Sequence, residues 1–495
     1  MGAGLLAAAM ACALLASAAT ANASADLTRA VPSARAAAAA SPPPTSAECL
    51  EALGVACYRP QQLQRAYDLG PLYARGYSGR GRTIVIVDPI GSPTIGADLA
   101  AFDRSFGLPA PPAFRVLQPE GPVPSFNPNN PDMVDKAGET TLDVEWAHAM
   151  APGADILLVE TPAEETATGG GFPQMIAAEN YVIEHNLGDV ISQSFSLPEQ
   201  NFPSRAYVLR LRYAYVDARR HRVTVLGASN DNGVTGFNRT GNGFYRHRVV
   251  QWPASDPLVT GVGGTTLHLA QSGTRTSPDT AWNDTWNPAV AALSQQTVPF
   301  PWASSGGLSR FFARPAYQDG VRRVAGNRRG VPDISMSAAL SGSVLIYHSF
   351  PGATAGWYTA GGTSEATPEF AGIVAIADQY TGHRLGLINP ALYRLEAAHA
   401  PGIVDVTKGS NSVAFTRNGG TFAVRGYRAR PGYDLVTGVG TINAARFIPE
   451  LAAAAKDGAC SLPRSVLRRH PSIDVPEGRI HAPVTRVAGH ALAPG

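Results

Sequence analysis

Two acidic residues stand four positions apart in the stretch ETTLDVEWAHAM, residues 139–150. At helical spacing, Glu139 and Asp143 share one face with mostly apolar neighbours, Leu142, Trp146, Ala147 and Met150. Like charges at this spacing repel, and burying ionised carboxylates is costly unless they are paired or protonated. A buried pair can instead share a proton and serve as a general acid or base.

A purely structural reading of the same stretch is also available. In that reading Glu139 sits in the first turn of a helix, where negative charge is favourable, and Asp143 pairs with an arginine. The helical spacing turns Glu145 and His148 away from the apolar stripe, so we expect both to be surface residues. Pro152-Gly153 should end the helix.

A candidate nucleophile lies in the stretch TAGGTSEATPEF, residues 359–370. Gly361 and Gly362 predict a tight turn before Ser364, and the residues that follow predict an apolar helix. A serine at a strand-to-helix turn lies at a helix N-terminus, where backbone N–H groups can meet an oxyanion. The alternative is that Ser364 is an ordinary N-cap.

Two further places carry carboxylates at strand ends or turns. In VLGASNDNG, residues 225–233, a predicted strand runs into a turn that contains Asp231. Loops after strand C-termini are where sites form in open α/β sheets, although a plain turn has the same composition. Asp405 and Asp434 each stand beside a turn-like segment, and their oxygens could serve a hard cation such as Ca²⁺.

These residues must be positioned by a large α/β domain, which we expect over residues 48–450. Short apolar runs alternate there with helical patterns, the signature of a mostly parallel sheet. The predicted strands cover 83–88, 155–160, 189–196, 222–229 and 258–264. The predicted helices cover 97–106, 139–150, 173–185 and 204–220.

The chain ends are predicted to lie outside this domain. Residues 1–25 resemble a secretory signal, 26–47 a linker or short pro-segment, and 451–495 a poorly ordered tail. We therefore expect a secreted, extracellular protein without a membrane-spanning segment. Four cysteines are present: Cys12 would leave with the signal, Cys49 and Cys57 should form a small disulfide loop, and Cys460 is left over.

The overall charge sets limits on partners. With 40 basic and 38 acidic residues the formal net charge is +2, so there is no reason to expect nucleic acid or an anionic membrane as a partner. No CxxC pair or histidine-rich spacing indicates a structural zinc site.

The chemical motifs, taken in order over about residues 60 to 445, closely resemble the sedolisins, the serine-carboxyl or kumamolisin-like peptidases. The matching segments are GRTIVIVD, E-x-x-x-D followed by VEWAHAMAPGA, LGASNDNG, SSGGLSRFFARPAYQ, RGVPDISMSA, GGTSEATPEFAGI and DLVTGVGTIN. G-T-S-x-x-T-P together with E-x-x-x-D makes chance agreement improbable. The resemblance implies a subtilisin-like fold, a single catalytic domain and a serine-type peptidase, that is, a hydrolase acting on polypeptides, as a monomer.

The resemblance also implies site roles. Ser364 corresponds to the nucleophile, Glu139 to the general base, Asp143 to the acid that orients and shares a proton with Glu139, and Asp231 to the oxyanion donor. One structural Ca²⁺ would be held by the side chains of Asp405 and Asp434 and the carbonyls of Val406, Arg430 and Gly432. Asp88, at the end of a predicted strand, stands where some members carry an accessory acid.

Three departures from the family pattern bear on these expectations. Only about 35 residues separate the signal from the catalytic part, where the family usually has a folded pro-domain. Glu365 follows the nucleophile in place of a small residue, and Asn230 replaces a glycine before Asp231. The alternatives are a tripeptidyl-peptidase rather than an endopeptidase, and a catalytically inactive secreted binding protein on a peptidase scaffold. A Ser-His-Asp protease would need a His-Gly-Thr-like helix start, which none of the 11 histidines provides.

Overall fold

A twisted, mostly parallel sheet forms the centre of the computed structural model, which describes residues 31–32 and 42–459. Its order is β11-β10-β8-β6-β3-β5-β4, with β14 also paired to β10. All five predicted strands are present: β3 (Thr83–Pro89), β5 (Asp155–Thr161), β6 (Val190–Gln193), β8 (Thr224–Ala228) and β10 (Thr260–Thr266). The strands not predicted are β4 (Phe114–Leu117), β14 (Ile334–Ser337) and the antiparallel β11 (Thr280–Ala281).

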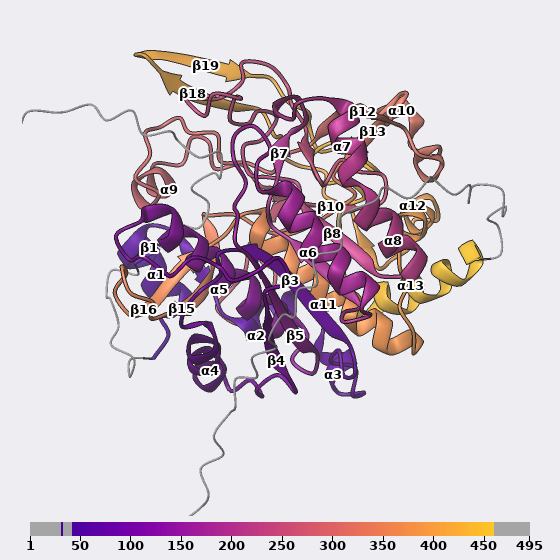
Figure 1. Cartoon of the computed structure of the whole chain (residues 1–495), viewed down its shortest axis with the longest axis horizontal. Helices are drawn as coiled ribbons and strands as arrows, with labels where there is room; N and C mark the ends of the chain where they lie inside the picture. The colour runs from indigo at the N-terminus through magenta and orange to yellow at the C-terminus, as the bar shows by residue number, and fades with distance from the viewer. Residues whose placement is uncertain (1–30, 33–41, 460–495) are drawn as a thin grey trace, which may run out of the picture.

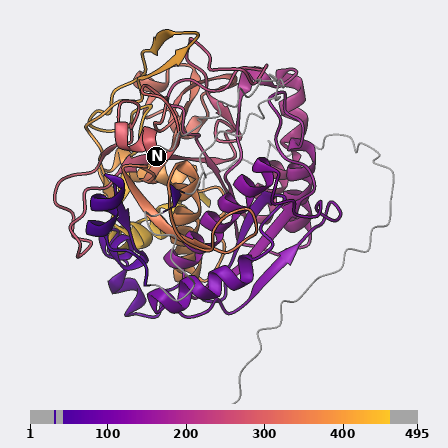
Figure 2. The same ribbon diagram turned by 90° about the vertical axis from the view of Figure 1, so that its left-hand side faces the viewer.

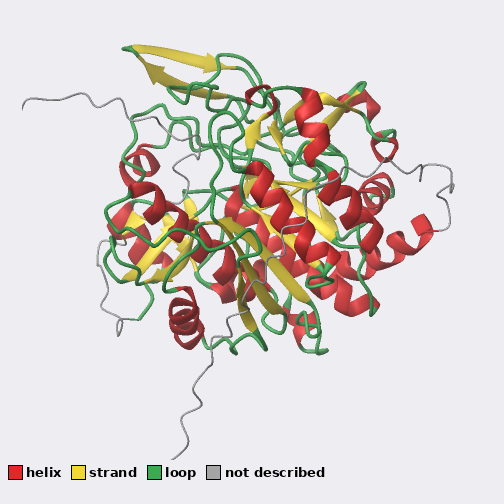
Figure 3. Cartoon of the chain, in the orientation of Figure 1, coloured by secondary structure: helices red, strands yellow, loops and turns green. Residues whose placement is uncertain are grey.

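Helices cover both faces of this sheet, as Figure 3 shows. In β3, Ile84 and Ile86 pack into one core and Val85 and Val87 into another, because successive side chains point to opposite faces. Burial on both faces explains why the strands read as continuous apolar runs. One face carries α4 (Ile95–Phe106), α5 (Pro131–Met150) and α11 (Thr363–Thr381); the other carries α6 (Phe172–Glu184), α7 (Arg205–Leu211) and α8 (Tyr213–His221).

Helix α5 differs from its prediction in two respects. It begins at Pro131 behind an Asn130 N-cap, so Glu139 is in mid-helix and the first-turn reading is wrong. Glu145 and His148 are also fully buried, not exposed. Glu145 Oε2 accepts a hydrogen bond from the Tyr347 N–H at 3.0 Å, and His148 Nε2 lies 3.3 Å from Asp103 Oδ1. The surface prediction is wrong because residues 140–150 of α5 are all buried, packed in one core with α11, α4 and the second sheet, so this part of the helix has no solvent face.

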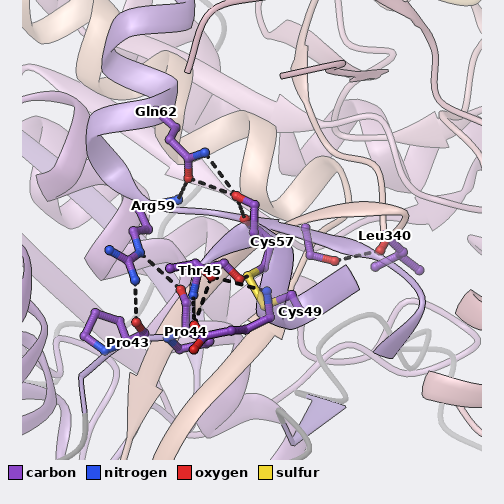
Figure 4. Close-up of a disulfide and its surroundings, with 11 residues drawn as sticks. Pro43, Pro44, Thr45, Cys49, Cys57, Arg59, Gln62 and Leu340 are labelled. Atoms are coloured by element: carbon purple, nitrogen blue, oxygen red, sulfur yellow. Dashed lines mark hydrogen bonds between the residues drawn. A yellow bond between two sulfur atoms is a disulfide. The ribbon is translucent and has the colours of Figure 1, made fainter. Parts of the chain in front are cut away.

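The second sheet has the order β1-β16-β15-β2. It pairs N-terminal strands with β15 and β16, and β16 ends shortly before Ser364. Its strands are β1 (Val31–Pro32), β16 (Gly356–Ala360), β15 (Gly342–His348) and β2 (Ala56–Tyr58). The predicted disulfide is confirmed: Cys49 in α1 (Ser46–Leu53) bonds to Cys57 in β2, as Figure 4 shows. Cys12 and Cys460 lie outside the described residues.

The C-terminal part closes the domain with α12 (Asn389–Ala397) and α13 (Ala444–Ala459). Helix α13 crosses the boundary expected at 450, because Leu451, Ala452 and Ala454 are buried. A hairpin of β18 (Val413–Arg417) and β19 (Gly420–Val424) projects from one end of the molecule (Figures 1 and 2). Shorter elements are α2 (Pro60–Ala66), α3 (Gly70–Tyr73), β7 (Leu197–Pro198), η1 (Glu199–Asn201), β9 (Gln251–Trp252), α9 (Pro288–Leu293), β12 (Gly307–Ala313), η2 (Ala316–Gln318), α10 (Arg322–Ala325), β13 (Arg328–Val331), β17 (Ile403–Val404) and β20 (Thr441–Ile442).

Within residues 31–32 and 42–459, none of the helices has the length and apolar character needed to cross a bilayer. The expected signal sequence, residues 1–25, lies outside the described residues.

Candidate active site

Ser364 is held in the first turn of α11 by a glycine turn. Gly362 has a φ of +103°, and a Cβ at this position would stand 2.6 Å from Asp231 Oδ2. Both the backbone conformation and the close approach therefore require glycine. The N-cap of α11 is Gly362, so the reading of Ser364 as an ordinary N-cap is wrong. Ser364 is 2% exposed and follows shortly after the end of strand β16.

Helix α5 brings Glu139 to Ser364. The two helices pack closely at Gly372, where a Cβ would meet Met150 Cβ at 2.7 Å and the Ala147 carbonyl oxygen at 3.2 Å. The Ser364 hydroxyl lies close enough to the Glu139 carboxyl to favour its ionised form. Burial raises the pKa of Glu139 well above its ordinary value; Ser364 opposes this rise and the neighbouring Asp88 adds to it.

Asp143 lies one turn further along α5 and is fully buried. Its Oδ2 accepts a hydrogen bond from Ser194 Oγ at 2.7 Å, and its Oδ1 has no hydrogen-bond partner among the described residues. Burial first, and then the charges of Asp88 and Glu139, raise the pKa of Asp143 well above its ordinary value. In the described part of the chain no ion pair joins Asp143 to an arginine, which removes the structural reading of this residue.

Asp88 completes a group of three carboxyls. It stands near the end of β3, is 2% exposed, and lies close to the Thr140 side chain. Burial raises its pKa to about 7, against the lowering effects of Thr140 and Lys136. Because Asp88 raises the pKa of both Glu139 and Asp143, and Glu139 raises that of Asp143, the group can hold shared protons at mildly acidic pH.

Asp231 reaches the same place from the loop after β8. Its Oδ1 accepts hydrogen bonds from the Thr363 N–H and the Thr363 hydroxyl, both at 2.7 Å, while its Oδ2 has no partner among the described residues. Burial raises the pKa of Asp231 to about 7, although both bonds from Thr363 lower it. Below that pH the free Oδ2 can carry a proton and donate it to a developing oxyanion.

Asn230 fits its position despite differing from the family pattern. Its φ is +82°, in the left-handed region that asparagine tolerates better than most non-glycine residues. Its N–H donates to Thr363 Oγ1 at 3.0 Å, and its side-chain amide donates to Ser196 Oγ at 3.2 Å. Asn230 and Asp231 therefore both form hydrogen bonds with Thr363, and these bonds join the loop after β8 to the turn that precedes Ser364.

The sequence analysis assigned no role to three residues of the site. Ser194 and Thr363 donate hydrogen bonds to Asp143 and Asp231; Thr363 stands inside the G-T-S-x-x-T-P motif, and Ser194 has no distinctive spacing. Lys136 lies one turn before Glu139 and its Nζ is 2.9 Å from Glu165 Oε1. Its position three residues before the candidate base was a usable signal, because such residues are neighbours on a helix.

The expected calcium ligands lie on two segments, 405–406 and 430–434, which a hydrogen bond joins. The Gly432 N–H donates to Asp405 Oδ2 at 2.8 Å, and the Arg430 N–H donates to Asp434 Oδ2 at 2.8 Å. Two carboxylates and the nearby carbonyls form an all-oxygen set of the kind that Ca²⁺ prefers. Asp434 Oδ1 accepts hydrogen bonds from the Val436 and Thr437 N–H groups at 2.8 and 2.9 Å, so Asp434 Oδ2 and the Asp405 carboxylate are the side-chain oxygens that could serve a hard cation. The described residues contain no cluster of three or more His, Cys, Asp or Glu side chains suited to a metal.

Comparisons with known proteins identify the family of the chain. The subtilase family model matches residues 135–391. Kumamolisin from Bacillus sp. (strain MN-32) is 32% identical over 409 residues, covering 80% of this chain and 64% of that protein. Tripeptidyl-peptidase 1 from Mus musculus is 26% identical over 321 residues, covering 62% of this chain and 50% of that protein. The chain thus spans less than two thirds of the length of either relative.

The expected fold is confirmed by a solved structure. Pseudomonas sedolisin, a serine-carboxyl proteinase complexed with two molecules of pseudo-iodotyrostatin, superposes with a TM-score of 0.65 at 25% identity, over 81% of this chain and 99% of that one. The α/β architecture is therefore subtilisin-like, with a parallel sheet flanked by helices. The family model, the relatives and the shared fold agree: the chain belongs to the subtilase family, in its sedolisin group.

Proposed function

We propose that this protein is a secreted, acid-active serine-carboxyl endopeptidase. The observation that carries the proposal is the Ser364 hydroxyl close to the half-buried Glu139 carboxyl, with the buried Asp143 one turn along the same helix and Asp231 bonded to Thr363 beside the nucleophile. A serine and a carboxyl base in contact at a helix N-terminus, next to a carboxyl that can be protonated, are the parts that acyl transfer needs.

The proposed reaction assigns one proton to each step. Glu139 accepts the hydroxyl proton of Ser364 as Oγ attacks the scissile carbonyl, and the protonated Asp231 donates a hydrogen bond to the oxyanion. Glu139 then returns the proton to the departing amine, which leaves an acyl-enzyme. Water repeats the sequence and frees the acid product. Asp143 takes up part of the proton while Glu139 is protonated, so the buried pair need not carry two charges.

Activity at acid pH follows from the protonation state that each carboxyl needs for the reaction. Glu139 must be able to accept a proton, and Asp231 must hold one. The pKa of Asp231 is about 7, so its donor form is present below that pH and is lost as pH rises through it. The active range should therefore end near neutral pH.

The test is hydrolysis of a denatured protein by the purified chain between about pH 3 and about pH 8. We expect cleavage confined to acid pH. A peptide with a blocked N-terminus separates the two peptidase types, because a tripeptidyl-peptidase requires a free N-terminus and an endopeptidase does not. A folded protein without activity at any of these pH values would contradict the proposal and favour the inactive-scaffold alternative.

Asp231 gives a direct test of the oxyanion role. Asp231→Asn keeps a hydrogen-bond donor that no longer depends on pH, so the fall in kcat/KM near pH 7 should disappear while cleavage persists. Asp231→Ala removes the donor and should lower kcat by roughly 100- to 1,000-fold. Steady-state kinetics across pH measure both. Equal losses in the two variants at every pH would show that Asp231 does not act as the donor.

We also propose one structural Ca²⁺ at Asp405, Val406, Arg430, Gly432 and Asp434. The ion would bind the folded state, in which Asp405 meets Gly432 and Asp434 meets Arg430, and not the unfolded chain. Chelation should therefore lower the free energy of unfolding by the lost binding free energy, about 2.7 kcal/mol at a hundredfold excess of free ion over Kd. Tm should fall with it. Differential scanning calorimetry with and without chelator measures this. An unchanged Tm would contradict the calcium site, and Asp405→Asn provides the matched variant whose Tm should no longer respond.

Secretion is part of the proposal for two reasons. The disulfide between Cys49 and Cys57 is typical of proteins that fold in an oxidising compartment, and the first 25 residues have the composition of a secretory signal. N-terminal sequencing of protein recovered from culture medium would test it.

A further inference from the structure

A buried lysine stands beside the catalytic carboxyls. Lys136 lies on α5 one turn before Glu139, and its Nζ is 2.9 Å from Glu165 Oε1, with side chains only 8% and 5% exposed. Lysine is almost never fully buried unless it is paired, because removing its charge from water is costly. Neither Lys136 nor Glu165 has a role in the reaction proposed above.

Glu165 belongs to a tightly folded loop, residues 162–171, between β5 and α6. Within it the Thr166 N–H donates to the Gly170 carbonyl at 3.0 Å, and the Gly170 N–H donates to Thr166 Oγ1 at 2.8 Å. A Cβ at Gly171, whose φ is +80°, would stand 1.9 Å from the Glu164 carbonyl oxygen. The loop is thus a compact unit, and the ion pair with Lys136 joins it to α5.

The groups that face Lys136 come from three elements. Asp135 and Glu139 are on its own helix, Glu164 and Glu165 are on the loop, and Asp88 is on β3. All are acidic. Lys136 lowers the pKa of Glu139 and of Asp88, against the larger effect of their burial.

We propose that Lys136 is a positioning residue for the Glu139 base. Its ammonium favours the ionised form of Glu139, and its pair with Glu165 holds loop 162–171 against α5 beside the site. The inference rests on the proposed function and deepens it, because it assigns the lower pH boundary of the same reaction to a residue outside the motifs. In this scheme Glu165 keeps the lysine in place and compensates its burial.

The test compares the acid limb of kcat/KM in four variants: Lys136→Met, Lys136→Arg, Glu165→Gln, and the double variant Lys136→Met/Glu165→Gln. Lys136→Met and the double variant should move the limb up by about one pH unit, so that kcat/KM at a pH below the limb falls about tenfold. Lys136→Arg keeps the charge and should keep the limb in place. Glu165→Gln also keeps the lysine charge and should not move the limb upward.

A purely structural ion pair gives a different pattern. Breaking it from either side would then lower activity alike in Lys136→Met and Glu165→Gln, with the limb unmoved in both, and that result would overturn the proposal. An upward shift in Glu165→Gln equal to that in Lys136→Met would overturn it too.

A second measurement does not depend on catalysis, so it distinguishes failure of the proposed peptidase function from failure of the role inferred for Lys136. Without Lys136, the folded-state pKa values of Glu139 and Asp88 rise further above their unfolded values, and ionising them costs more stability. The Tm deficit of the double variant relative to wild type should therefore grow as pH rises above about 4.5. An inactive wild type with this growing deficit would contradict the peptidase and retain the electrostatic role, whereas a constant deficit would overturn that role.

Discussion

Replacing Ser364 with alanine, or Glu139 with glutamine, is expected to lower kcat by about 10⁴-fold or more while the protein remains folded. Alanine removes the attacking oxygen, and glutamine keeps the shape of Glu139 but cannot accept the hydroxyl proton. Hydrolysis of a denatured protein at acid pH measures the loss. The double variant should be hardly slower than either single one, because a nucleophile and its base act as a unit.

Glu145→Gln is the matched control for this prediction. Glu145 lies on the same helix and is fully buried, where Glu139 is half-buried, and its carboxyl accepts a hydrogen bond from the Tyr347 N–H. It should retain activity within a few-fold if the variant folds. Circular dichroism and Tm establish folding for each protein. Full activity in Ser364→Ala would exclude this serine as the nucleophile, and full activity in Glu139→Gln would exclude this base.

The second large effect is expected in stability, at a carboxyl pair that the reaction does not use. Glu365 and Glu369 are one turn apart on α11, have no exposed surface, and are close to each other. In the described part of the chain no ion pair involves either of them. Burial raises the pKa of both well above the ordinary value for glutamic acid; each is raised further by a neighbouring acid, Asp231 for Glu365 and Glu365 for Glu369.

The direction of the pH dependence follows from these raised pKa values. Below about pH 4.5, the unfolded-state pKa, both glutamic acids are protonated in the folded and unfolded chain, and they impose no ionisation penalty. As pH rises above that value, the unfolded chain releases protons that the folded chain retains, so the free energy of unfolding falls. Wild-type Tm should therefore be highest in acid and decrease toward neutral pH.

The variant Glu365→Gln/Glu369→Gln should remove this part of the pH dependence. Near pH 7 its Tm should exceed that of wild type by a few degrees, on the order of 5 °C, because a buried charge costs several kcal/mol. At about pH 4 the advantage should vanish, since wild type is then neutral as well. Glu51→Gln, an exposed residue of α1, should match wild type at both pH values. A variant less stable than wild type at neutral pH would contradict this account.

The strands and the candidate site could be read from local patterns. Apolar runs such as 83–88 and 155–160 predicted strands β3 and β5, because a parallel strand buried on both faces must be apolar throughout. Ser364 and Glu139 were identified through motifs whose spacing is short and distinctive. The contact between them was expected from the family resemblance, and the packing of α11 against α5 is what provides it.

Other features depended on the tertiary structure. Glu145 and His148 were expected on the surface because an amphipathic helix has a solvent face, but residues 140–150 of α5 are all buried, and no pattern within the helix reports that. The carboxylate spacing predicted a proton-sharing pair; it did not predict that Asp88 from β3 would join it, or that Lys136 would pair with a loop residue 29 positions away.

There is a physical reason why some features could be predicted from the sequence and others depended on the tertiary structure. Residue type and spacing within one helix or turn determine which side chains share a face, so this chain's sequence determined its candidate nucleophile, base and oxyanion donor. A pKa depends on burial and on charges brought from other elements. Only the packed structure therefore decided which carboxyls are desolvated, which of them carries a counter-charge, and over what pH range the proposed chemistry can run.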